Sequence, residues 1–96
     1  MMDKKTDEFY QRLQEELDRT TEVWPAPYLY KFIVPSDAVK VEEVKKAFDN
    51  TGAVINTHHS KTGKFTSLSI SLIVPDSTTV IGYYKAVSHI EGILSL

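Results

Sequence analysis

The sequence contains no cysteine, few glycines and prolines, and no long hydrophobic run. Without cysteine the chain can form neither a disulfide framework nor a thiolate metal site. No apolar stretch reaches the roughly 18 residues that a membrane-spanning helix needs, and the first residues lack the apolar core of a signal peptide. We therefore expect a cytoplasmic protein with no membrane segment.

The chain also has little net charge. It carries 11 basic and 13 acidic residues, which gives a formal net charge of −2. Because proteins that bind nucleic acid gain affinity by neutralising phosphates, this balance disfavours a nucleic-acid partner. The length of 96 residues, with 42% hydrophobic and 25% charged residues, suits one domain with a single modest core.

The clearest pattern lies between Phe65 and Asp76. Apolar residues alternate there with serines, which predicts a strand that has one buried and one polar face. The apolar set is Leu68, Ile70, Leu72 and Val74, and the polar set is Ser67, Ser69 and Ser71. Pro75 cannot donate to a sheet ladder and ends the strand, and Asp76 is placed to cap a following helix.

The N-terminal part has a different character. The spacing of Phe9, Leu13 and Leu17 predicts a helix over residues 6–19, whose narrow apolar stripe must dock on its own domain or on a partner chain. A joint over residues 20–27 holds two prolines and Trp24. We expect Trp24 to fill a gap at the edge of the core, and an exposed, partner-binding tryptophan is the alternative. Residues 1–27 are thus an N-terminal helix and joint, and residues 28–96 form the domain.

The sequence of residues 28–96 contains strand patterns and helix patterns. Strands are predicted at 28–34, 53–61, 65–74 and 92–96, and helices at 37–50 and 77–88. A two-residue turn at Thr62-Gly63 would pair Ile55 with Ile70. Gly82 lies in the middle of the last helix, where close packing would explain a glycine.

An internal repeat fixes the architecture. The segment 33–48 aligns with 73–87 so that Pro35 meets Pro75 and Asp37 meets Asp76. Two copies of a strand-then-helix unit predict a ferredoxin-like β-α-β-β-α-β sandwich, with four antiparallel strands and two helices on one face. The N-terminal helix is an addition to this plan.

The face of the sheet turned away from the helices, together with the hairpin, is the candidate interaction surface. Leu29 and Ile33 are too apolar to be exposed to water on this face without reason. We therefore expect that the N-terminal helix covers part of this face or that a partner protein binds there. The candidate residues are Lys31, Asn56, His58, Ser60, Lys61, Gly63, Lys64, Phe65, Ser67, Ser69 and Ser71.

The hairpin over residues 60–67 reads S-K-T-G-K-F-T-S. It resembles the S-x-x-G-[NK]-[YF]-x-S hairpin of the YbeD-like bacterial proteins, a domain family of unknown function. The resemblance extends from the strand at 28–32 to Leu96 and leaves the N-terminal helix and the joint outside. It implies a fold similar to ferredoxin-like and ACT regulatory domains, and it supplies no catalytic residues.

We recognise no set of residues in the sequence that is typical of a catalytic, cofactor-binding or metal-binding site. His58 and His59 are adjacent in a strand and point to opposite faces, and Gly63-Lys64 lacks the strand-to-helix context of a phosphate loop. We therefore predict a non-enzymatic protein-interaction or regulatory module that needs no cofactor and acts through another protein or self-association. An ACT-like small-ligand sensor, as a dimer, is the alternative. Weak RNA binding comes third, because the outward positions lack an aromatic stacking platform.

Overall fold

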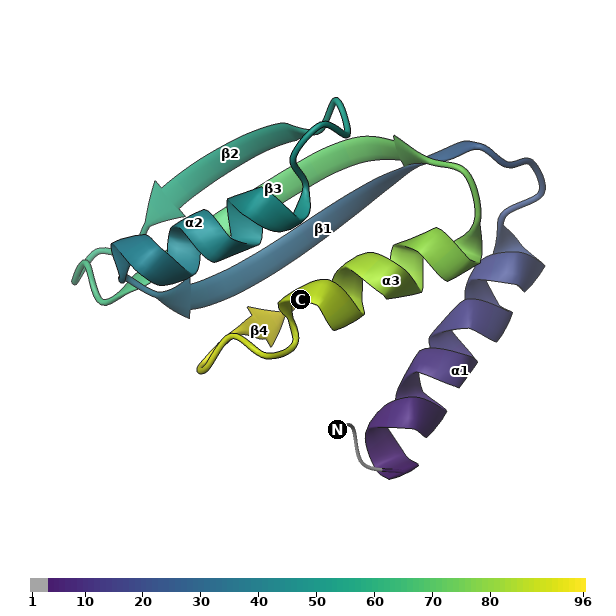
Figure 1. The fold of residues 1–96 in the computed structure, drawn as a ribbon, viewed down its shortest axis with the longest axis horizontal. Coiled ribbons are helices and arrows are strands. Elements are labelled where there is room, and N and C mark those ends of the chain that lie inside the picture. Colours follow the sequence, from purple (N-terminus) through teal and green to yellow (C-terminus); the bar gives the residue numbers. More distant parts are fainter. Residues whose placement is uncertain (1–3) are drawn as a thin grey trace.

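The computed structural model describes residues 4–96. The elements, in chain order, are α1 (Lys4–Thr20), β1 (Ala26–Pro35), α2 (Ala38–Ala47), β2 (Val54–His59), β3 (Phe65–Val74), α3 (Ser77–Val87) and β4 (Leu94–Ser95). The strands form one antiparallel sheet in the order β2-β3-β1-β4, and α2 and α3 lie on the same side of it (Figure 1). The predicted β-α-β-β-α-β plan with an added N-terminal helix is confirmed.

The two central strands have the predicted faces. In β3 the even-numbered residues from Thr66 to Val74 are buried, and the three serines lie on the other side, half-buried or exposed. In β1 the buried residues are Tyr30, Phe32 and Val34. Because Tyr30 pairs with Ile70 and Phe32 with Leu68, the buried faces of both strands coincide and form one wall of the core.

The repeated helix starts are also confirmed. Pro35 is the last residue of β1, and Pro75 follows the last residue of β3. The Asp37 carboxylate accepts a hydrogen bond of 2.9 Å from the Val39 amide, and the Asp76 carboxylate accepts one of 2.7 Å from the Thr79 amide. Each aspartate therefore satisfies an amide that the first helical turn leaves without a partner.

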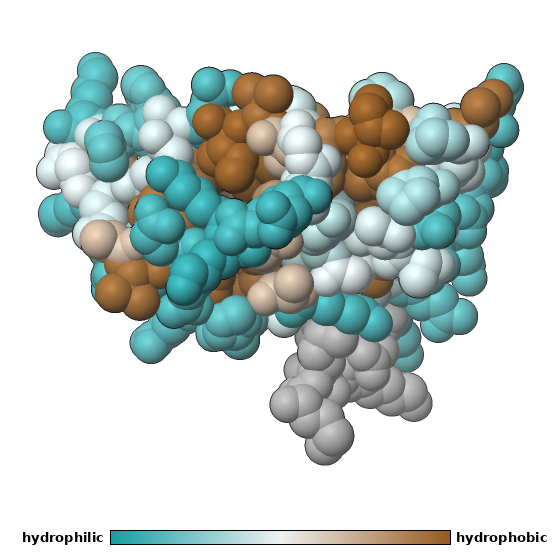
Figure 2. Space-filling model, turned by 45° about the horizontal axis from the view of Figure 1, so that its top comes forward, coloured by the Kyte–Doolittle hydropathy of each residue, from teal (hydrophilic) through white to brown (hydrophobic). Residues whose placement is uncertain are grey.

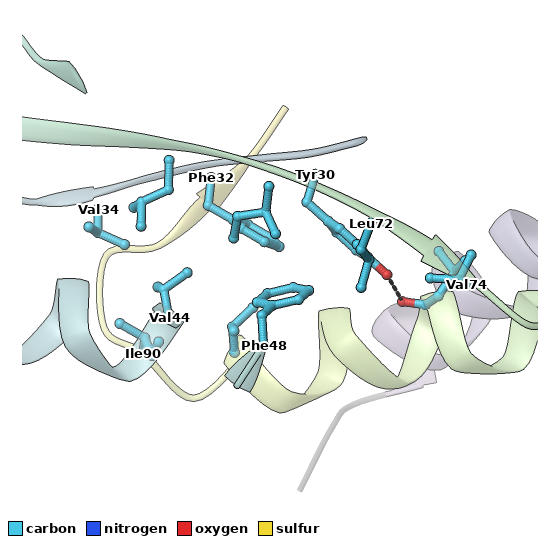
Figure 3. Close-up of a cluster of buried hydrophobic side chains, with 12 residues drawn as sticks. Tyr30, Phe32, Val34, Val44, Phe48, Leu72, Val74 and Ile90 are labelled. Carbon is cyan, nitrogen blue, oxygen red and sulfur yellow. Dashed lines mark hydrogen bonds between the residues drawn. The ribbon is translucent and has the colours of Figure 1, made fainter. Parts of the chain in front are cut away.

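The core lies between the sheet and the α2–α3 layer (Figure 3). Phe48 at the end of α2 packs against Tyr30, with ring centroids 5.1 Å apart. The Tyr30 hydroxyl donates a hydrogen bond of 2.9 Å to the Val80 carbonyl on α3. Burial raises the pKa of Tyr30, since the charged phenolate would lose its hydration there.

The β2–β3 hairpin keeps the predicted register but not the predicted turn. Ile55 pairs with Ile70 as expected. The Ser60 amide, however, donates to the Phe65 carbonyl at 2.9 Å, so four residues, 61–64, form the loop and Lys61 is not paired with Lys64. Lengthening a hairpin loop by one residue on each side removes one pair and leaves the others in place.

Other boundaries shift as well. β1 begins at Ala26, inside the predicted joint, and β4 is shorter than residues 92–96. The helix expected to reach Asn50 ends at Ala47, because the next residue, Phe48, already leaves helical geometry with a φ of −111° and a ψ of 14°. Asn50 and Gly52 then adopt positive φ values of 60° and 76°, which no right-handed helix allows. The prediction of close packing at Gly82 is wrong, since a methyl group there would meet no atom within 4 Å.

The N-terminal helix docks on its own domain. α1 lies beside α3, where Ser77 donates a hydrogen bond of 2.6 Å to Asp18 and Gln14 donates one of 2.9 Å to Thr78 (Figure 1). Leu17 and Trp24 pack at the margin of the core, which confirms the gap-filling interpretation of Trp24. No helix of the described residues is long and apolar enough to cross a membrane.

Candidate functional site

The face of the sheet away from α2 and α3, called the open face below, collects alternate residues of all four strands. It consists of Leu29, Lys31, Ile33, Val54, Asn56, His58, Phe65, Ser67, Ser69, Ser71, Ile73 and Leu94. The candidate residues of β1, β2 and β3 are thus brought together on one surface. Ser60, Lys61, Gly63 and Lys64 lie apart from it, in the hairpin loop at one end.

Besides Leu29 and Ile33, which the sequence predicted on this face, the structure adds three apolar members. Val54 and Ile73 share the parity of the polar residues in their strands, so the period-two pattern could have identified them. Leu94 pairs beside Ile33, but its strand has only two residues and gives almost no periodic signal. The open face is therefore more apolar than the sequence suggested.

The register arranges the open face in rows that run across the strands. One row contains Leu29, Ser71 and Val54, and a second contains Ile33, Ser67 and His58 beside Leu94. Between them runs a polar row of Lys31, Ser69 and Asn56. The exposed residue Leu96 lies at the end of this row, where its amide donates to the Lys31 carbonyl at 2.9 Å. Two partly apolar ends are therefore separated by a polar middle that holds a lysine.

The end of the open face that contains Leu29, Ser71 and Val54 has a surface depression. A depression of about 430 Å³ lies where β2 stops short of the end of β3, because Val54 is opposite Ser71 and the last residues of β3 extend beyond it. Its lining consists of Pro27, Tyr28, Leu29, Gly52, Ser71, Leu72 and Ile73. Exposed hydrophobic side chains reach the surface in separate clusters with polar residues between them, as one side of the molecule shows in Figure 2.

The hairpin motif has a structural explanation. The Ser60 hydroxyl accepts a hydrogen bond of 3.2 Å from the Phe65 amide, and the Gly63 amide donates to the Ser60 carbonyl at 2.9 Å. Gly63 has a φ of 74°, which a residue with a side chain adopts only under strain. Ser60 and Gly63 thus shape the loop, whereas the Phe65 side chain is 46% exposed on the open face.

A second polar cluster lies on the buried side of the hairpin. The Thr66 hydroxyl lies 2.9 Å from the Ser36 hydroxyl and 3.0 Å from Nδ1 of His59. The Ser36 amide also donates to the Lys64 carbonyl at 2.9 Å. Thr66 is only 1% exposed, and both of its polar neighbours are within hydrogen-bond distance of its hydroxyl. The geometry supports a structural link between the β1–α2 loop and the hairpin.

The sheet carries lysine and histidine side chains but no carboxylate side chain. Neither the four strands nor the loop of residues 60–64 contains an aspartate or glutamate. Lys31 and His58 lie on the open face, and Lys61 and Lys64 lie in the hairpin loop, all exposed. Within residues 4–96 no group of three or more histidine, aspartate or glutamate side chains could hold a metal ion.

Comparison with known proteins places the chain in a family without a known role. A family model described as "Protein of unknown function (DUF493)" matches residues 19–96. No curated protein and no solved structure matches the chain significantly. The match covers the whole sheet with α2 and α3, and it includes the joint around Trp24, which the YbeD-like resemblance had left outside. Nearly all of α1 lies outside the match.

Proposed function

The chain belongs to the DUF493 family of proteins of unknown function, and from this premise we propose that it is a non-enzymatic protein-interaction module whose contact surface is the open face with the adjoining hairpin. A regulatory role would follow from the partner that it binds.

The observation that supports the proposal is the placement of exposed hydrophobic side chains. Leu29 is 51% and Ile73 62% exposed, and Val54, Phe65 and Leu94 are exposed on the same face. Leu96 is also exposed, directly after β4, where its amide donates to the Lys31 carbonyl at 2.9 Å. The other large exposed hydrophobic residues are scattered, with Phe9 on α1, Val23 in the joint and Val39 on α2. Grouped exposure of this kind marks interaction sites, whereas single exposed residues are ordinary.

Affinity capture from a native lysate tests the proposal. Leu29→Ser and Ile73→Ser alter the open face, and Val39→Ser makes the same kind of change on the exposed side of α2. Proteins enriched on the wild-type chain and on Val39→Ser should be lost from the two open-face variants, once circular dichroism has shown that all are folded. Retention of the same proteins by all three variants would contradict the proposal.

A second candidate is small-ligand sensing, as in the ACT-like alternative. The depression of about 430 Å³ favours it, since ligand sites in proteins commonly measure about 300–1,000 Å³. A thermal-shift screen of metabolites tests this function, because a ligand at 100 times its dissociation constant stabilises a protein by about 2.7 kcal/mol. The absence of any stabilising metabolite, together with a monomer in sedimentation, would contradict it.

The predicted cytoplasmic location is part of the same proposal. It is supported by a composition that is ordinary for a folded, water-soluble domain. Fractionation of the native cells tests it, and recovery of the protein outside the cytoplasmic fraction would contradict it.

A further inference from the structure

We propose that the open face binds an acidic segment of another protein, in which a carboxylate lies between two apolar side chains about 13–14 Å apart. This inference rests on the proposed function and adds the chemistry of the partner.

The separation predicted for the partner's two apolar side chains follows from the rows of residues across the sheet. Leu29 and Ile33 are four residues apart on β1, and the cross-strand pairs continue their rows to Ser71 and Ser67. Because a strand rises about 3.4 Å per residue, the two apolar ends are separated by about 13–14 Å. A partner must therefore present two apolar groups at this separation if it is to cover both ends.

The acidic character predicted for the partner follows from the row of residues between the two apolar ends. Lys31 is exposed and lies between Leu29 and Ile33 on the same strand, with Ser69 beside it on β3. The four strands and the 60–64 loop contain no aspartate or glutamate side chain that could pair with Lys31. Lys61 and Lys64 add positive charge at the hairpin end. A partner carboxylate placed opposite Lys31 would supply the complementary charge that steers and specifies association.

Charge also disfavours a second copy of this chain as the occupant. In a two-fold dimer centred on the open face, the polar rows of the two copies would meet and bring one Lys31 close to the other. Like charges opposed across an interface are unfavourable, and the open face offers no acidic residue to separate them. Single-stranded RNA is disfavoured for a different reason, since Phe65 is the one phenylalanine, tyrosine or tryptophan among the open-face positions.

Two backbone conformations satisfy the required spacing. In an extended segment, residues i, i+2 and i+4 point to one side and span about 13–14 Å. In a helix, residues i, i+4 and i+8 lie near one face and span about 12 Å. The predicted partner motif is therefore apolar–acidic–apolar at one of these two spacings.

Selection from a phage-displayed library of random 16-residue peptides tests this chemistry. Peptides selected on the wild-type chain should carry aspartate or glutamate between two apolar residues at one of the two spacings. Lys31→Glu should weaken synthetic copies of these peptides by on the order of tenfold or more at low salt, since it replaces attraction by repulsion. Lys46→Glu, the same change on the exposed side of α2, should leave their affinity unchanged. A new selection on Lys31→Glu should favour lysine or arginine at the middle position.

The outcomes separate this inference from the function on which it rests. Peptides that lose binding to Leu29→Ser and Ile73→Ser but contain no central acidic residue would overturn the inference and leave the interaction surface intact. Peptides that bind these two variants as well as the wild type would overturn both. Three other results would overturn the acidic segment as the occupant. The selection could yield no peptide. The chain could self-associate in a way that Leu29→Ser abolishes, or it could bind RNA in a way that Lys31→Glu abolishes.

Discussion

Replacing Ile70 by alanine removes one of the central side chains of the core. Ile70 lies in the middle of β3, pairs with Tyr30 on one side and Ile55 on the other, and is 0% exposed. The change deletes the equivalent of three buried carbon groups at about 0.8 kcal/mol each, and the cavity that remains adds roughly 1–2 kcal/mol. We therefore expect Ile70→Ala to lower the free energy of unfolding by about 3–4 kcal/mol, a large part of the roughly 5–14 kcal/mol available to a domain of this size.

Urea denaturation followed by far-ultraviolet circular dichroism measures this loss. The matched control is Ser69→Ala, one residue away on the open face, which should change the free energy of unfolding by less than about 0.5 kcal/mol. Thermal unfolding should agree, with Tm lowered by about 15–25 °C for Ile70→Ala and nearly unchanged for Ser69→Ala. Equal losses in the two variants would refute the assignment of the faces of β3.

Three further predictions concern single residues. Gly82→Ala should raise the free energy of unfolding by about 0.5–1 kcal/mol in urea titrations, because Gly82 is exposed in a helix and a methyl group there meets no atom within 4 Å; a loss would show that the glycine is needed. Gly92→Ala should instead lower it by at least about 1–2 kcal/mol, since Gly92 has a φ of 82° and the new methyl group would lie 2.9 Å from Cγ of Pro35; a neutral result would contradict this placement. Tyr30→Phe should lower it by about 0.5–1.5 kcal/mol at neutral pH through the lost hydrogen bond to Val80. Burial raises the pKa of Tyr30 in the folded state, so the stability that the neutral phenol provides is present below pH 10 and is lost as the pH rises above it. Tyr30→Phe should therefore unfold less steeply above pH 10, and an unchanged alkaline slope would count against this reasoning.

The N-terminal helix shows the limit of local information. Its apolar stripe established that α1 had to dock, but a stripe of three residues is compatible with the sheet, with α3 or with another chain. The structure places it beside α3 through Ser77 and Thr78, which belong to an element nearly sixty residues away. That choice decides whether the open face is covered, and nothing within the helix itself encodes it.

The hairpin shows a similar limit. The alternation of two strands determined which residues pair, and that register is present in the structure. The loop is closed by the Ser60 amide, which donates to the Phe65 carbonyl, and the Ser60 hydroxyl accepts from the Phe65 amide. These two bonds leave residues 61–64 in the loop. The same sequence motif that indicated a turn therefore did not specify its geometry.

The sequence by itself determined the order of the elements, the buried faces of β1 and β3, and the ends of the repeated units. Each of these depends on neighbours two to four residues apart or on the geometry of a single proline or aspartate. Only the tertiary structure decided that Val54, Ile73 and Leu94 join Leu29 and Ile33 around Lys31, because that surface is made by pairing strands that are distant in the chain. Local periodicity fixes which side of a strand a residue faces, whereas the neighbours across the sheet depend on contacts that no short segment contains.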